Sequence, residues 1–471
     1  MKQAGIGSQV ASESSRKLFG TDGIRGLANE YPMRGEVMLE LGRALAMVFQ
    51  LGPAQVREHR VLIAKDTRRS GYMLEDALAA GICSMGVNVL QVGPMPTPGL
   101  AFLTADMRCD AGAMISASHN SFEDNGIKFF SGDGLKLPDA TEARIESLMF
   151  SEELRRERPV GADIGRARRI DDASGRYIVF LKKTFPEEFD LEGLRIAIDC
   201  ANGAAYHVAP TVLEELGAEV IPIGTSPDGT NINLECGALY PEKMAEAVRA
   251  SRADVGIALD GDADRAILCD GTGAIVDGDH VLAMLGIDLH KNGRLEQAMV
   301  VGTHYSNAGL EIALERHGIR FVRAPVGDRY VLEAMQREGA NLGGEKSGHI
   351  ILRDWISTGD GMLTGLQVLA LMRRTGRSLK ELRTAMEQLP QVLEGIRVRE
   401  KPPIESLAGV SKTIKRLESS LEGRGRILVR YSGTELLVRV MVEGENQAQI
   451  TKVAAEISAE IEKAIGEVGP S

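Results

Sequence analysis

Three stretches of the chain share one pattern: a short apolar strand, a polar or glycine-containing turn, a helix that ends at glycine, and a second apolar strand. They begin at Arg60, Leu194 and Ala298. Glycine after a helix supplies the left-handed residue that ends it, and strands joined through such helices form βαβ units. The wide spacing of the copies predicts three related α/β domains and not a short-period solenoid.

The C-terminal part of the chain departs from this pattern. It alternates short apolar strands with helices expected over residues 411–421 and 446–465, which is typical of a smaller α+β domain. A chain of 471 residues is long enough for several domains. We place a flexible tail and four domains at residues 1–16, 17–170, 171–276, 277–388 and 389–471.

Composition excludes some classes of function. The net charge is −11 and aromatic residues make up 4% of the chain, so the excess of cations and the stacking rings typical of nucleic-acid binding are missing. No apolar run approaches the ~20 residues of a membrane-spanning helix, and residues 1–16 lack the apolar core of a signal peptide. The five cysteines are scattered, which indicates reduced thiols. We expect a cytoplasmic protein without nucleic-acid or membrane partners.

The first candidate functional loop follows an apolar segment and holds Ser118 beside His119. A serine next to a histidine, in a turn of small residues, can be an exposed nucleophile. The alternative is structural: Ser118 or Asn120 would cap a following helix. These residues alone favour capping, because adjacent Ser and His are common.

The second loop follows an apolar strand and presents three carboxylates at alternate positions, Asp260, Asp262 and Asp264. Three hard oxygen donors on one turn suit Mg²⁺. An EF-hand is excluded, because its sixth position would be Arg265 instead of glycine. A phosphatase that forms an aspartyl-phosphate and a solvated acidic turn stay open as alternatives.

The third loop is rich in glycine and contains Glu345, Lys346, Ser347 and His349. It is not a phosphate-binding Walker A loop, because glutamate precedes the lysine where glycine is required. Its donors and acceptors suit sugar hydroxyls, with Lys346 and His349 as charged neighbours. A plain surface turn is an equal alternative.

The fourth loop contains Arg430, Ser432, Gly433 and Thr434, and Arg439 stands on the strand that follows. Two guanidinium groups, hydroxyls and the amides of a glycine turn make a suitable phosphate cradle. An ordinary hairpin with exposed arginines is the alternative.

Together, the four loops, in this order and one in each predicted domain, resemble those of the α-D-phosphohexomutase family, from Leu18 to about Gly444. The resemblance implies α/β domains with mixed sheets around a central cleft, and a smaller C-terminal α+β domain. It also implies that Ser118 is a phosphorylated nucleophile, and that Ser118 and the three aspartates bind one Mg²⁺.

The resemblance also assigns the other motif residues. Arg25 and Lys128 would lie near the transferred phosphoryl group. Lys128 would be the first candidate for proton transfer at the sugar hydroxyl, provided that its pKa is lowered, and His349 the second. Substrate would be bound by His119, Arg265, Glu345, Ser347, Arg430, Ser432, Gly433, Thr434 and Arg439.

Within the family, Phe19–Gly26 and Arg439–Gly444 are similar to the branch that acts on glucosamine 6-phosphate. The sequence departs from this branch at Ser121, Lys346 and Leu436, where Pro, Gln and Pro are usual. The resemblance implies glucosamine 1,6-bisphosphate as intermediate and activator, a role in making amino-sugar precursors for the cell wall, and, by analogy, a homodimer.

Three other functions remain open from the sequence. A relative acting on glucose or mannose phosphates would keep the same mechanism. A phosphosugar phosphatase would use the same serine, metal and phosphate loop, and a sensor would bind phosphosugars without turning them over.

Overall fold

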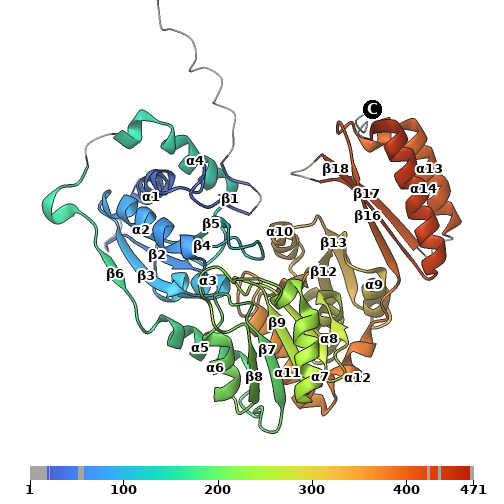
Figure 1. Cartoon of the computed structure of the whole chain (residues 1–471). Coiled ribbons are helices and arrows are strands. Elements are labelled where there is room, and N and C mark those ends of the chain that lie inside the picture. The colour runs from blue at the N-terminus through green and yellow to red at the C-terminus, as the bar shows by residue number, and fades with distance from the viewer. Residues whose placement is uncertain are drawn as a thin grey trace, which may run out of the picture.

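The computed structural model describes residues 18–20, 22–50, 58–155, 158–421, 425–432 and 436–466 (Figure 1). The predicted tail at residues 1–16 lies outside this part. Four sheets follow one another along the chain, three of mixed direction and the last antiparallel. The predicted class, three α/β domains with mixed sheets and a smaller C-terminal α+β domain, is therefore confirmed. The domain limits stay a prediction.

The first sheet places parallel strands beside antiparallel ones. Its order is β1 (Ile24–Leu27), β5 (Asp124–Ser131), β4 (Ala111–Ile115), β2 (Arg60–Lys65), β3 (Asn88–Pro94) and β6 (Ala167–Arg169). β2 is parallel to β3 and β4, whereas β5 runs antiparallel to β4 and β1. Alternate residues of β2 face opposite sides. One side is covered by α1 (Gly35–Gln50), α2 (Arg69–Cys83) and α4 (Asp139–Met149), and the other by α3 (Thr97–Asp106).

The second sheet repeats this arrangement. Its order is β11 (Ile275–Val276), β10 (Ala266–Asp270), β9 (Val255–Leu259), β7 (Arg195–Asp199) and β8 (Glu219–Ile223). β7 is parallel to β8 and β9, and β10 runs antiparallel to β9. The helices α5 (Ala173–Thr184) and α6 (Val208–Glu215) cover one face and α7 (Pro241–Ser251) the other.

The third sheet has the order β13 (Arg320–Ala324), β12 (Met299–Thr303), β14 (Leu342–Gly344) and β15 (Ile350–Leu352). β12 is parallel to β13 and β14, and β15 is antiparallel to β14. The helices of this part are α8 (Gly278–Lys291), α9 (Ala308–Glu315), α10 (Asp328–Glu338), α11 (Gly361–Thr375) and the short α12 (Leu379–Leu382).

The C-terminal domain is a three-stranded antiparallel sheet packed against two helices. The strand order is β16 (Gln391–Arg397), β18 (Leu437–Gly444) and β17 (Gly425–Tyr431). The helices are α13 (Ala408–Ser420) and α14 (Gln447–Ile465), within three residues of the predicted limits. The single-turn 3₁₀ helices of the described chain are η1 (Glu152–Arg155), η2 (Gly161–Asp163), η3 (Gly237–Leu239), η4 (Glu296–Ala298), η5 (Arg383–Ala385) and η6 (Ile404–Ser406).

The apolar cores show which domains are fixed to one another. One buried cluster runs from β2 and α3 through α5, the second sheet and α11 to α8 and β14. The first three domains therefore share a continuous core, which holds them in one arrangement. The C-terminal domain has a separate core of its own, and Figure 1 shows it set apart from the first domain. No helix in the described ranges is long and apolar enough to span a membrane.

Candidate active site

The three predicted loops of the α/β domains occupy equivalent places in the fold. Each follows a strand that is parallel to the strand opening its βαβ unit: β4 precedes Ser118, β9 precedes Asp260 and β14 precedes Glu345. In α/β sheets, ligands bind at the carboxyl ends of the parallel strands. The fold therefore brings one loop from each domain toward a common site.

Ser118 is buried and its Oγ donates a hydrogen bond to Asp260 Oδ2 at 2.7 Å. His119 Nδ1 lies 3.3 Å from the same Oγ. Burial, and then the charges of Arg265 and Arg25, lower the pKa of His119 to about 4, so its ring is neutral near pH 7. The loop leads into β5, not into a helix, so the capping interpretation of Ser118 and Asn120 is wrong. Ser118 also has φ +50°, a left-handed conformation that is rare outside glycine.

The three aspartates form a buried cluster. One carboxylate oxygen from each of Asp260, Asp262 and Asp264 lies within 4.8 Å of the other two. Within the described part of the chain, Asp262 Oδ1 and Asp264 Oδ1 are buried and accept no hydrogen bond. Such orphaned oxygens are costly unless a cation binds them. The donor set therefore fits a divalent metal ion, and the alternative of a solvated acidic turn is wrong.

The pKa values of the three aspartates are shifted in different directions. Burial raises the pKa of Asp260 well above its usual value, and repulsion by Asp264 and Asp262 adds to this effect. Burial and Asp262 raise the pKa of Asp264 in the same way. For Asp262 burial acts upward too, but Lys128 and a 2.6 Å hydrogen bond from Thr97 Oγ1 outweigh it, so its pKa is lowered.

Lys128 is buried among carboxylates. Its Nζ lies 3.3 Å from Asp262 Oδ2, 3.8 Å from Asp264 Oδ2 and 3.2 Å from Asp22 Oδ2. Burial favours the neutral amine, but Asp22, Asp262 and Asp264 together raise the pKa of Lys128 above its usual value. The lowered pKa that proton acceptance requires is therefore absent in this arrangement. Arg25 joins the cluster by donating from Nη1 to Ala117 O at 3.2 Å and by pairing with Asp22.

Residues that the sequence did not single out complete this charge network. Asp22 Oδ1 accepts a hydrogen bond from Lys136 Nζ at 2.8 Å, and Lys136 also pairs with Asp328 of the third domain. Asp328 Oδ2 lies 3.7 Å from His349 Nε2. Asp22 stands within the Phe19–Gly26 motif, so the sequence could have indicated it as a site residue. Lys136 and Asp328 stand in no recognised motif.

The third loop faces the loop that carries the three aspartates. Glu345 Oε1 accepts a hydrogen bond from Gly327 N at 2.8 Å, and Ser347 Oγ lies 3.2 Å from Glu345 Oε2. His349 Nε2 is 3.9 Å from Asp264 Oδ2. A cavity of about 130 Å³ lies here, lined by Asp22, Asp264, Arg265, Val326, Gly327, Asp328, Arg329, Tyr330, Glu345 and His349. Lys346 does not line this cavity, because its Nζ donates to Gln391 Oε1 of β16 at 2.9 Å.

The fourth loop is only partly described. Gly433 and Thr434 lie outside the described residues. Arg430 Nε donates to Tyr305 Oη at 2.7 Å, and its guanidinium lies 4.5 Å from the centre of the Tyr305 ring. Arg439 is opposite Arg430 in the register of β17 and β18. The described contacts thus tie Arg430 to the third domain, and none of them joins it to Ser118.

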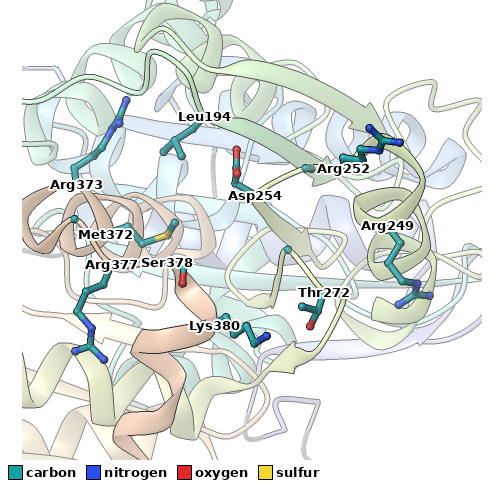
Figure 2. A pocket seen from close by; sticks show the side chains of 13 residues that line it. Leu194, Arg249, Arg252, Asp254, Thr272, Met372, Arg373, Arg377, Ser378 and Lys380 are labelled. Carbon is teal, nitrogen blue, oxygen red and sulfur yellow. The ribbon is translucent and has the colours of Figure 1, made fainter.

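A larger cavity lies elsewhere and contains none of the four loops. It measures about 660 Å³ and lies between the end of α7 and the region of α11 and α12 (Figure 2). Figure 2 shows that the side chains of Arg249, Arg252, Arg373 and Arg377 point away from one another. Diverging cations do not form a binding centre, so the smaller cavity beside the aspartate triad is the candidate active site.

Comparison with known families agrees with this geometry. The models of phosphoglucomutase/phosphomannomutase alpha/beta/alpha domains I, II and III match residues 16–156, 176–273 and 277–389, and the model of the C-terminal domain matches residues 395–460. The chain belongs to the phosphoglucomutase/phosphomannomutase family. It is 56% identical to the phosphoglucosamine mutase of Syntrophotalea carbinolica, over 96% of this chain and 98% of that protein. It is 57% identical to that of Geobacter metallireducens, over 96% and 99%.

Solved structures of lower identity share the fold. A phosphoglucomutase/phosphomannomutase family protein from Burkholderia thailandensis superposes with a TM-score of 0.78 at 22% identity, over 95% of this chain and 97% of that chain. The N-acetylphosphoglucosamine mutase of Aspergillus fumigatus, crystallised with GlcNAc-6P and magnesium, gives 0.63 at 18% identity, over 95% and 96%.

Proposed function

We propose that this chain catalyses the phosphoglucosamine mutase reaction, which interconverts glucosamine 6-phosphate and glucosamine 1-phosphate. The proposal rests on one observation: the Oγ of the buried Ser118 lies 2.7 Å from Oδ2 of Asp260, the first aspartate of the buried triad. This site occurs in a chain that is 56–57% identical to phosphoglucosamine mutases. The chain covers 98–99% of the length of those proteins.

The chemistry requires Ser118 to carry a phosphoryl group before substrate binds. In the first half-reaction, O1 of glucosamine 6-phosphate attacks the phosphoserine, the Oγ–P bond breaks and glucosamine 1,6-bisphosphate forms. After the bisphosphate turns over in the site, Ser118 Oγ attacks its 6-phosphate. The P–O6 bond then breaks, glucosamine 1-phosphate leaves and phosphoserine is restored. Phosphoryl transfer of this kind depends on in-line positioning and charge stabilisation.

We propose Mg²⁺ as the cofactor, held by Asp260, Asp262 and Asp264 with the phosphoryl group on Ser118. The support is the all-oxygen donor set and the two buried carboxylate oxygens that accept no hydrogen bond in the described chain. A bound Mg²⁺ would offset the negative charge that repels an incoming phosphate. His119 is neutral, and it lies within hydrogen-bond distance of Ser118 Oγ without adding charge.

Proton transfer needs a group that first accepts the hydroxyl proton and later returns it to the leaving oxygen. Lys128 remains the first candidate on position, but the carboxylates around it hold it as the ammonium. Two of those carboxylates belong to the triad, so a cation bound there would weaken this effect. His349, 3.9 Å from Asp264 Oδ2, is the second candidate. Arg25 has the simpler role of charge stabilisation.

The remaining residues bind substrate in this proposal. Glu345 and Ser347 read the sugar hydroxyls, and Arg265 lines the same cavity. The non-reacting phosphate is held by Arg430, Ser432, Gly433, Thr434 and Arg439. Because the C-terminal domain has its own core, we propose that it moves over the bound sugar and that Arg430 then leaves Tyr305. We place the reaction in the cytoplasm, on the route to amino-sugar precursors of the cell wall, and propose a homodimer.

The test is an isomerisation assay of the wild type and Ser118→Ala. Glucosamine, glucose and mannose 6-phosphates are compared, with Mg²⁺ and a trace of the matching 1,6-bisphosphate. Ser151→Ala is the matched control, because in the described part of the chain its Oγ bonds to Leu148 O of its own turn. We expect the wild type and the control to prefer the glucosamine phosphate and Ser118→Ala to be inactive.

Each other result has a definite meaning. Preference for glucose or mannose phosphate would keep the mechanism and change the substrate. Release of inorganic phosphate without isomerisation would select a phosphatase. Binding of phosphosugars without any turnover would select a sensor.

A further inference from the structure

The reacting serine and the metal loop belong to different domains. Ser118 follows β4 of the first sheet, and the triad follows β9 of the second. A nucleophile displaced by about 1 Å can lose on the order of a hundredfold in rate. Some feature of the interface between the two domains must therefore set the position of the Ser118 loop relative to the triad.

Arg68 holds this loop from its own domain. The side chain is fully buried, and its Nε donates to Asp66 Oδ2 at 2.8 Å. Its Nη2 donates to the main-chain oxygens of Ser118 at 3.0 Å and Asn120 at 2.8 Å. Its Nη1 donates to the main-chain oxygens of Asp124, at 3.1 Å, and of Ser121. One planar guanidinium thus binds four carbonyls of one turn, which the single ammonium of lysine cannot do.

Asn233 holds the same turn from the second domain. Its Nδ2 donates to Ser118 O at 2.8 Å and to Asn120 O at 2.9 Å, the two carbonyls that Arg68 also binds. Asn233 is buried and has φ +58°, and its main-chain N donates to Ala201 O at 2.9 Å. The side chain is therefore fixed at the interface by its own backbone.

This contact lies directly against the metal loop. A Cβ added at Gly261, between the first two aspartates, would lie 2.5 Å from Ser118 O and 2.8 Å from Asn233 Nδ2. The main chain of the metal loop, the Ser118 carbonyl and the Asn233 amide are therefore in van der Waals contact. A shift of Asn233 would change the distance between Ser118 and the triad.

The backbone conformation of Ser118 explains why its carbonyl needs donors from both domains. A left-handed φ of +50° is unfavourable for serine and persists only where the surroundings enforce it. Donors from both domains converge on the carbonyl of that same residue. We propose that Arg68 and Asn233 form a two-domain carbonyl clamp, in which Asn233 is a positioning residue that fixes the phosphoserine loop against the metal loop.

Arg68 and Asn233 do not line the cavity beside the aspartate triad, so loss of the clamp should act on the chemical step. The proposal rests on the proposed mutase reaction. The main variant is Asn233→Gly, because glycine adopts φ +58° without strain while the side chain that carries the amide is lost. We expect kcat to fall about a hundredfold while KM for glucosamine 6-phosphate stays within about twofold.

Two further variants make the test specific. Asn231→Ala is the matched control: its side chain bonds to Asp228 N and Ser226 O within the same loop and does not reach Ser118. It should behave as wild type. Asn233→His should recover part of kcat, because histidine tolerates a left-handed backbone and can donate from Nδ1.

A second readout does not depend on turnover. Hydrogen exchange followed by mass spectrometry should show about tenfold faster exchange at residues 116–121 in Asn233→Gly and no change in Asn231→Ala. An unchanged kcat together with unchanged exchange would overturn the clamp, as would equal losses in both variants. A wild type without mutase activity, but with faster exchange in Asn233→Gly alone, would overturn the proposed reaction and leave the clamp standing.

Discussion

A buried link between Tyr177 and Asp360 joins distant parts of the shared core, and its contribution to stability should depend on pH. Tyr177 of α5 is fully buried and its hydroxyl donates to Asp360 Oδ2 at 2.6 Å. Asp360 also caps α11, because its Oδ1 accepts from Leu363 N at 2.9 Å. The next residue, Gly361, donates its N–H to Ala263 O in the metal loop at 3.0 Å. Replacing Tyr177 by Phe removes one hydroxyl and keeps the ring.

The expected size of the effect follows from the charge of Asp360. Burial raises the pKa of Asp360 from 3.8 to about 6, and the Tyr177 hydrogen bond opposes that rise. Because the folded-state pKa is the higher one, the contribution of Asp360 to stability is greatest below pH ~4 and falls by about 3 kcal/mol as the pH rises through about 6. A hydrogen bond to a charged group contributes about 1.5–3 kcal/mol, and one between neutral groups about 0.5–1.5 kcal/mol. Tyr177→Phe should therefore lower the free energy of unfolding by about 2 kcal/mol at pH ~8 but by only about 1 kcal/mol at pH ~5.

The assay is urea unfolding of the wild type, Tyr177→Phe, Asp360→Asn and the double variant at both pH values. Asp360→Asn keeps a cap acceptor but cannot ionise, so in its background the effect of Tyr177→Phe should no longer change with pH. Tyr206→Phe is the control, because no hydrogen bond of the Tyr206 hydroxyl is found in the described chain. An equal loss at both pH values in the wild-type background would refute the reasoning, since it would mean that Asp360 does not change charge.

Three further outcomes are expected. Gly261→Ala should reduce kcat at least tenfold, because the new methyl would lie 2.5 Å from Ser118 O. Gly175→Ala is the control and should not reduce kcat, because the space around its Cβ is open. Both variants are measured by initial rates. Chelation by EDTA should abolish isomerisation, and added Mg²⁺ should restore it, while retention of full activity would contradict the metal site. Lys346→Gln should leave the preference among sugar phosphates within about twofold, because Lys346 binds Gln391 and does not line the cavity; a switch of preference in a competition assay would show the opposite.

The fold and the grouping of the candidate site residues could be predicted because their signals are local. Each βαβ unit is a contiguous pattern, and the aspartates at Asp260, Asp262 and Asp264 follow their strand directly. The sequence could not decide between a nucleophile and a cap at Ser118, because that depends on whether a helix or a strand follows. The structure excludes the cap, since β5 begins at Asp124 and no helix follows Ser118.

The charge network and the clamp could not be predicted, because their partners are far apart in the sequence. Lys136 and Asp328 are separated by 192 residues and meet only because the first three domains share a core. In the sequence, Asn233 is not distinguished from other loop asparagines. Its amide binds the carbonyl of Ser118, which is 115 residues earlier in the chain. Arg68 stands in the turn after the first predicted strand, where an arginine is usually exposed, so nothing local indicated a fully buried guanidinium.

The left-handed backbone at Ser118 also restricts which residues can replace the proposed nucleophile. Threonine offers the same hydroxyl and is a single base change away from every serine codon. Its branched Cβ is badly tolerated at a φ of +50°. The backbone conformation therefore disfavours threonine, although it is the most conservative substitution chemically. Glycine and asparagine tolerate this conformation but offer no hydroxyl to a phosphate. As long as this turn keeps its left-handed conformation, its backbone geometry requires serine as the hydroxyl-bearing residue. This holds independently of how well another hydroxyl would react.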